Sequence, residues 1–306
     1  MATSHPISWL AGLWPRVIAH SGVGYLAVAY GVSRWLTRRS PAVVSAPVGL
    51  GEVKLENPIC VTTDGVRLQG WIIEPPTPRG TIALFHGLRG NRMSLLDRIT
   101  ILIEGGYRCV AFDHRAHGES GGGVTSFGYH ERHDVAAVAQ LVTSRWPDEP
   151  RAALGFSMGA AALCFAGPNT HAFDAIILES VYHDLARAFH HRIGGVFPEW
   201  FQHFRRGVIW FTQRRLGVPI HEIAPIDHIA RLVPRPTLLL TGSDDPHAPP
   251  HEVRTLAEQM PESARFHIIA GADHENVVAQ GGDGYRQLLL AFLDRHLANS
   301  RHVVAA

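Results

Sequence analysis

The feature that most restricts the fold of this chain is a glycine-flanked serine between an apolar run and a helix-forming run. Residues 152–154 are apolar, residues 155–159 read Gly-Phe-Ser-Met-Gly, and residues 160–165 are small or helix-forming. A serine on a sharp strand-to-helix turn has a strained backbone, and glycines two residues to either side avoid collisions with the neighbouring strand and helix. The pattern predicts that Ser157 is a nucleophile above a helix N-terminus, where free N–H groups favour negative charge. The alternative is a Gly/Ser turn that only packs closely.

Apolar runs typical of buried strands alternate with helical periodicity along the rest of the chain. The expected strands are residues 53–55, 59–62, 66–73, 81–85, 108–112, 152–154, 174–178, 237–241 and 265–269. The expected helices are residues 95–104, 129–146, 158–165, 253–260 and 285–297. The turn at residues 63–65 predicts a hairpin. The alternation predicts a mostly parallel sheet with helices on both faces.

Composition excludes several classes of protein. A hydrophobic content of 46% and a charged content of 18% indicate a globular chain rather than a disordered one. The formal net charge is +1, so the chain lacks the excess of basic residues that is typical of proteins that bind nucleic acid. The three cysteines form no disulfide framework.

The first 40 residues differ from the rest. Residues 17–33 contain no Asp, Glu, Lys or Arg, but they include three glycines together with His20 and Ser21. A spanning helix needs about 20 apolar residues. Three interpretations stay open: a membrane anchor over residues 7–36, a helix docked on the globular body, and a signal peptide. With an anchor, the arginines that follow it place the catalytic body in the cytoplasm; without one, the expectation is a soluble cytoplasmic protein.

Five stretches carry a resemblance to a known family. They are residues 86–87 (His-Gly), 106–120, 155–159, 242–249 (Gly-Ser-Asp-Asp-Pro-His-Ala-Pro) and 271–276 (Gly-Ala-Asp-His-Glu-Asn). In this order the chain resembles an α/β-hydrolase, of the branch with serine aminopeptidase-like and prolyl-oligopeptidase-like hydrolases and small esterases. The resemblance implies a hydrolase domain over residues 53–298, after a linker at 41–52 and before a tail at 299–306.

The resemblance also implies a Ser-Asp-His triad. A serine hydroxyl needs a base within hydrogen-bond reach, and the base needs an orienting carboxylate. His274 is the expected base, on the loop where the family carries it, ahead of His267 and His247. Asp245 is the expected acid by its place in the pattern.

Two other carboxylates stay open as the acid, and the loop at 113–120 raises a further question. The alternative acids are Asp244 and Glu179, whereas Asp273, beside His274, points elsewhere if the base points into the site. Asp113, His114 and His117 lie close enough in sequence to suggest a metal, but the family uses this loop structurally, so no metal and no cofactor is expected. Ala116 stands where the family usually has glycine.

The oxyanion of the reaction needs two fixed N–H donors. Backbone N–H groups of Leu88 and Met158 are expected to supply them.

More than fifty residues separate the strands at 174–178 and 237–241, which is too long for a plain connection. We expect a small helical cap over about residues 183–235. Its aromatic residues either pack on the body or line an acyl pocket: Phe189, Phe197, Trp200, Phe201, Phe204, Trp210 and Phe211.

Together these observations predict a serine hydrolase, carboxylesterase-like (EC 3.1.1), that cleaves a small-molecule ester or acyl substrate through an acyl-enzyme. The alternatives are a peptidase or thioesterase of the same fold and, from another class, a ligand-binding or membrane-tethered relative without catalysis.

Overall fold

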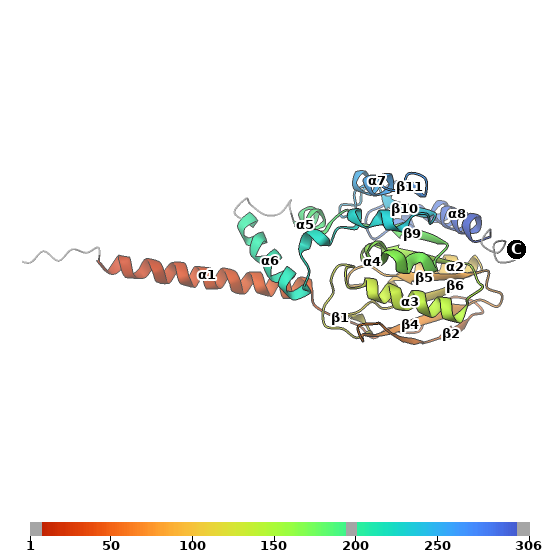
Figure 1. Cartoon of the computed structure of the whole chain (residues 1–306), viewed down its shortest axis with the longest axis horizontal. Helices are drawn as coiled ribbons and strands as arrows, with labels where there is room; N and C mark the ends of the chain where they lie inside the picture. Colours follow the sequence, from red (N-terminus) through yellow and green to blue (C-terminus); the bar gives the residue numbers. More distant parts are fainter. Residues whose placement is uncertain (1–7, 194–200, 299–306) are drawn as a thin grey trace, which may run out of the picture.

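The computed structural model describes residues 8–193 and 201–298, and Figure 1 shows the course of the chain. The strands are β1 (Ser40–Pro41), β2 (Lys54–Glu56), β3 (Ile59–Val61), β4 (Arg67–Glu74), β5 (Thr81–Phe85), β6 (Arg108–Phe112), β7 (His117–Gly118), β8 (Arg151–Phe156), β9 (Ala175–Glu179), β10 (Thr237–Gly242) and β11 (Ala264–Ile269). The α-helices are α1 (Ser8–Leu36), α2 (Leu96–Glu104), α3 (Arg132–Arg145), α4 (Met158–Ala166), α5 (Leu185–Ile193), α6 (Phe201–Leu216), α7 (Pro250–Glu258) and α8 (Val277–Leu297).

One sheet organises the body. Within the described residues it has nine strands, in the order β11-β10-β9-β8-β5-β6-β4-β2, with β3 paired to β4. The strands from β11 to β6 run parallel, whereas β4 is antiparallel to β6, β2 and β3. The predicted hairpin is the β3–β4 pair, in which Ile59 lies opposite Gln69. Parallel strands direct their carboxyl ends to one edge, and this edge carries the candidate site.

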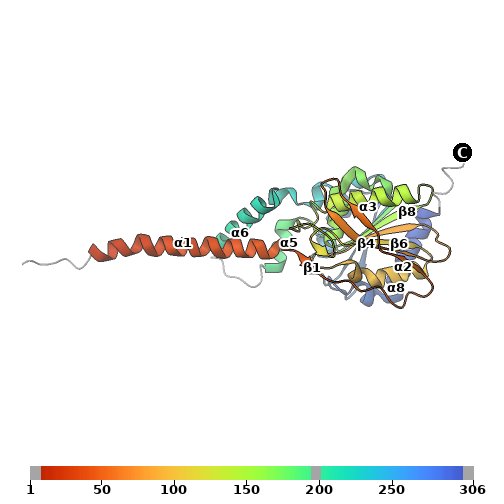
Figure 2. The same ribbon diagram turned by 90° about the horizontal axis from the view of Figure 1, so that it is seen from below.

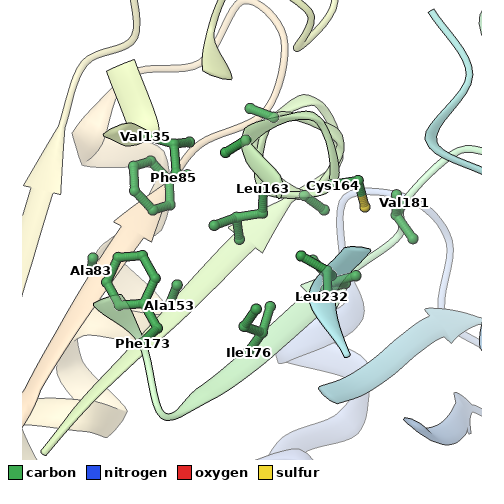
Figure 3. Packing of buried hydrophobic residues seen from close by; sticks show 14 of the residues in the cluster. Ala83, Phe85, Val135, Ala153, Leu163, Cys164, Phe173, Ile176, Val181 and Leu232 are labelled. Carbon is green, nitrogen blue, oxygen red and sulfur yellow. The ribbon is translucent and has the colours of Figure 1, made fainter. Parts of the chain in front are cut away.

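The alternation of side chains along each strand divides the core into two layers. Ala83 and Phe85 of β5 belong to one apolar cluster, and Ile82 and Leu84 belong to the other. Figure 3 shows the first cluster, which includes Ala83 and Phe85 of β5 and Leu163 of α4. The first cluster packs against α3, α4 and α7, and the second against α2 and α8. Figure 2 shows α3 on one side of β4 and β6 and α2 and α8 on the other.

The predicted elements are confirmed with small shifts of their ends, and α8 is the main exception. It begins at Val277, whereas the sequence predicted a helix from residue 285. Gly282 has φ 48° inside α8 and marks a kink between two helical segments. The apolar periodicity that follows residue 285 therefore identified only the second segment.

One interpretation of residues 7–36 is a membrane anchor, which requires a helix that can span the bilayer. These residues fall mostly within α1, a helix of 29 residues. In the part of the chain that the structure describes, no helix is long and apolar enough to cross a membrane. At 1.5 Å per residue α1 is long enough to span, so its apolar character is what falls short. The expected transmembrane helix is therefore not found among the described residues.

Helix α1 instead packs against α6 of the cap, and Figures 1 and 2 show the two side by side while α1 extends away from the body. The Tyr30 ring meets the Phe211 ring edge-on at 5.4 Å between centres. A Cβ atom placed on Gly207 would lie 2.4 Å from the Tyr25 hydroxyl. Arg215 Nε donates to Thr37 Oγ1 at 2.8 Å. Of the three interpretations, these contacts favour the docked helix.

The expected domain boundaries stay a prediction, with one observation on the linker. Its first residue, Pro41, lies in β1, which pairs with β7 in the loop after β6. The expected cap at 183–235 contains α5 and α6, and the tail at 299–306 lies outside the described residues.

Candidate active site

The turn between β8 and α4 holds Ser157 in a strained conformation, with φ 51° and ψ −109°. The two flanking glycines are required by space. A Cβ on Gly155 would lie 2.5 Å from the backbone N of Ala160, and one on Gly159 would lie 2.1 Å from the carbonyl oxygen of Phe85. The Ser157 N–H donates to the Glu179 carbonyl at 2.8 Å, which ties the turn to β9. Such a positive φ at a non-glycine residue persists only where the surroundings enforce it.

His274 reaches this serine from the loop between β11 and α8. Its Nε2 atom lies 2.9 Å from Ser157 Oγ, and its Nδ1 atom lies 3.0 and 2.9 Å from the two carboxylate oxygens of Asp245. An Nδ1–H that donates to the carboxylate leaves Nε2 as the acceptor for the serine proton. The imidazole is buried between the rings of Phe156 and His247, whose centres lie 5.3 and 5.0 Å from its own.

Asp245 lies on the loop after β10 and is almost fully buried. Burial alone raises the pKa of this carboxyl, but the hydrogen bond and charge of His274 and the N–H groups of Ala248 and His247 outweigh it, and the pKa falls to about 2. Those two N–H groups lie 2.9 and 2.8 Å from Oδ1. The carboxylate is thus ionised at neutral pH and fixed in position.

A cavity of about 130 Å³ opens beside Ser157. Leu88 and Met158, the two residues expected to stabilise an oxyanion, both line it. Met158 is the first residue of α4, so its N–H has no partner within that helix. Gly87 precedes Leu88, and a Cβ there would lie 2.9 Å from the Phe156 ring and 3.5 Å from Ser157 Cβ. The loop after β5 therefore approaches the serine closely because residue 87 is glycine.

Comparisons with known proteins support the fold on which this site is built. The family model described as serine aminopeptidase, S33, matches residues 76–216, which include Ser157 but neither Asp245 nor His274. The structure of the esterase Pf2001 of Pyrococcus furiosus has a TM-score of 0.70 at 22% identity, and the match covers 85% of this chain and 98% of that one. A thermophilic esterase of Thermogutta terrifontis gives a TM-score of 0.56 at 19% identity, covering 79% of this chain and 99% of that one.

The protein has the α/β-hydrolase fold.

Among curated relatives, the uncharacterized protein YqkD of Bacillus subtilis is 26% identical to this chain over 235 residues, 75% of this chain and 76% of that protein. The uncharacterized protein YfhR of Escherichia coli K12 is 25% identical over 241 residues, 75% of this chain and 77% of that protein.

The alternative acids do not contact the His274 ring. Asp244 accepts a hydrogen bond from Ser243, and Asp273 is exposed and accepts from the N–H groups of the two residues that follow His274. Glu179 is fully buried, but its carboxylate binds Arg98 and Tyr285. Among the candidate acids of the described part of the chain, Asp245 is the one hydrogen-bonded to His274.

Of the two alternative bases, His267 is exposed on β11. His247 lines the cavity, and its ring centre lies 5.0 Å from that of His274.

Arg98 is the site residue that sequence reasoning missed. It lines the same cavity, is 4% exposed, and donates from Nε to Glu179 Oε2 at 2.6 Å. A signal was available, because Arg98 falls on the apolar stripe of the predicted helix, between Leu95 and Leu102. A charged residue at such a position requires a partner or a function.

The loop from Asp113 to Ser120 contacts His86, which begins the loop beside Ser157, and so has the structural role that the resemblance implied. The His114 N–H donates to His86 Nε2 at 2.9 Å. His86 Nδ1 therefore carries the proton and donates to the Gly87 carbonyl at 2.7 Å. Burial lowers the pKa of His86 well below its ordinary value, so the ring stays neutral. Ala116 keeps a left-handed φ of 61°, the conformation that favours glycine at this position.

The apolar part of the cavity comes from the cap and from the loop before α3. Phe127, Tyr182, Leu185, Ala188 and Phe189 line it. Of the aromatic residues expected in the cap, Phe189 lines the cavity, Phe211 packs on Tyr30 and Trp210 is largely exposed. Phe197 and Trp200 lie outside the described residues, as do the side chains of Phe201 and Phe204.

Proposed function

We propose that this α/β-hydrolase cleaves carboxylic esters through an acyl-enzyme, with Ser157 as nucleophile, His274 as base and Asp245 as orienting acid. The observation that carries the proposal is the continuous chain of hydrogen bonds from Asp245 through His274 to Ser157 Oγ. It is the arrangement that a weakly nucleophilic hydroxyl requires.

In the proposed mechanism His274 Nε2 accepts the Ser157 proton while Oγ attacks the ester carbonyl. The carbonyl oxygen gains negative charge, which the N–H groups of Leu88 and Met158 stabilise. His274 then protonates the departing alcohol, which leaves the acyl group on Ser157. Water, deprotonated by His274, attacks the acyl-enzyme, and the carboxylic acid leaves as Ser157 recovers its proton.

Labelling with a fluorophosphonate tests the nucleophile. Wild type is expected to label, and Ser157→Ala is expected to lose labelling and to hydrolyse 4-nitrophenyl esters at least about 10⁴-fold more slowly. Ser180→Ala is the matched control, because Ser180 is also buried, also has a positive φ of 50° and follows the neighbouring strand β9. Labelling of Ser157→Ala at the wild-type rate would contradict the assignment. A series of 4-nitrophenyl esters of increasing acyl length then measures the pocket.

A peptidase is the second candidate, and the match to the serine aminopeptidase model favours it. An amide needs a protonated leaving nitrogen, a demand that the same His274 can meet. Turnover of aminoacyl 4-nitroanilides at a kcat/KM comparable to that of the esters would favour this reaction over ester cleavage.

A further inference from the structure

The cavity beside Ser157 has two chemically different sets of lining residues. Phe127, Leu185 and Phe189 represent the apolar set, which belongs to one buried cluster with the cap. Ser94 and Arg98 belong to the polar set and come from the segment that starts α2. A substrate that fills such a cavity has an apolar part and a polar part.

Arg98 is the fixed cation of the polar set, and its hydrogen bonds are incomplete. Nε donates to Glu179 Oε2, while Glu179 Oε1 already accepts from Tyr285. The buried Nη2 atom has no hydrogen-bond partner among the described residues. Burial lowers the pKa of the guanidinium, but the charges of Glu179 and Tyr285 outweigh burial, and the pKa is raised. The group is therefore a permanent cation, and one of its donor atoms, the buried Nη2, has no partner among the described residues.

This cation lies close to the reacting groups. Its guanidinium carbon is 4.9 Å from the centre of the Phe156 ring, and the same ring lies 5.3 Å from that of His274. Arg98 and the proposed base thus contact the same aromatic ring. Glu275 is the carboxylate that also lines the cavity, but it is exposed, so solvent screens its charge more than that of the buried arginine.

We propose that the preferred substrate of this hydrolase is an ester that carries a carboxylate, which the cavity-lining guanidinium of Arg98 binds while the apolar part packs against the cap. The planar guanidinium is suited to a carboxylate because it offers parallel donors to both oxygens. The inference rests on the proposed ester hydrolysis. The competing explanation is that Arg98 and Glu179 form a structural ion pair with no contact to substrate.

Two matched pairs of esters measure the preference. In the first pair the acyl group carries the charge: 4-nitrophenyl hydrogen glutarate against 4-nitrophenyl methyl glutarate. In the second the alcohol carries it: 4-carboxyphenyl acetate against 4-(methoxycarbonyl)phenyl acetate. The readout is the ratio of kcat/KM, charged over capped, after subtraction of the uncatalysed rate. A charged hydrogen bond predicts a ratio about 10- to 100-fold above one in at least one pair.

Variants assign that ratio to Arg98. Arg98→Met is made together with Glu179→Gln, because loss of one partner leaves a buried unpaired charge. The ratio is expected to fall to about one in this double variant. Glu179→Gln alone keeps the cation and removes its competing carboxylate, so the ratio stays or rises. Arg98→Lys keeps the charge without the planar fork, lowers the ratio several-fold, and replaces the double variant should that not fold.

Arg108→Met is the matched control, since Arg108 is also 4% exposed and ion-paired, to Glu74 and Glu149, but does not line the cavity. Its ratio should equal that of wild type. A wild-type ratio near one in both pairs, or a high ratio that survives the loss of Arg98, overturns the inference. Failure of the proposed function is separate: wild type would then neither label with the fluorophosphonate nor hydrolyse the capped esters.

Discussion

Gly159→Ala is predicted to weaken both the fold and the catalytic turn. The added Cβ would lie 2.1 Å from the carbonyl oxygen and 2.5 Å from the carbonyl carbon of Phe85. Removing this overlap requires α4 and β5 to move apart by roughly 1 Å. The overlapping atoms belong to the backbone of a central strand, which cannot rotate aside as a side chain does. We expect unfolding to become easier by about 3 kcal/mol, a large part of a typical 5–15 kcal/mol.

The matched control is Gly284→Ala, on the exposed side of α8, where a Cβ meets nothing within 4 Å. In an exposed helix alanine is favoured over glycine, so this variant should gain up to about 1 kcal/mol. Urea unfolding followed by circular dichroism measures both changes. With a slope of about 3 kcal/mol per molar, the Gly159→Ala midpoint falls by about 1 M.

Catalysis provides a second readout of the same variant. A displacement of about 1 Å at Ser157 should slow fluorophosphonate labelling roughly 10²-fold. The reasoning is refuted if Gly159→Ala unfolds within about 0.5 kcal/mol of wild type and labels at the wild-type rate, because α4 could then move away from β5 without consequence.

Three further predictions follow from the contacts of Asp245 and of α1. Asp245→Asn removes the acceptor that fixes the His274 tautomer, and kcat/KM for 4-nitrophenyl esters should fall about 10³- to 10⁴-fold; a loss below tenfold would argue for another acid. The pKa of Asp245 in the folded state is about 2, below the ordinary 3.8. The ionised carboxylate therefore stabilises the folded state by about 2 kcal/mol above pH 4, and this stabilisation is lost as pH falls toward 2. Urea midpoints measured at pH 6, 4 and 3 should show the loss in wild type and not in Asp245→Asn. Gly207→Val, which places atoms against the Tyr25 hydroxyl, should release α1 and speed its proteolysis, whereas Gly31→Val, with open space around its Cβ, should not; equal rates would mean that α1 does not depend on this contact.

Much of the fold follows from local patterns in the sequence. The central parallel strands are continuous apolar runs because both of their faces are covered, and each was expected within two residues of its observed ends. Where a local pattern suggested the wrong arrangement, the observed one depends on how apolar the whole segment is or on contacts with elements remote in sequence. The apolar stretch around residue 25 suggested a membrane-spanning helix, but no described helix is long and apolar enough to span, and the stretch packs against α6, almost two hundred residues away in sequence.

The candidate site also has features that local sequence predicts and features that only the packed structure shows. The glycine–serine turn is encoded locally, since φ/ψ strain and close backbone approach depend on neighbours in the chain. The Arg98–Glu179 pair is not, because its members come from α2 and β9, and only the packed structure shows which donors of the guanidinium remain without a partner.

By itself, the sequence determined the order of the strands and helices along the chain, the strained turn at Ser157 and the residue types available for chemistry, because these depend on propensity, periodicity and steric demands within a few residues. The tertiary structure decided which carboxylate faces His274, which cation borders the cavity and where α1 lies. Those outcomes depend on burial and on distances between elements remote in sequence, and such distances exist only after β8, β9, β10 and β11 are laid side by side.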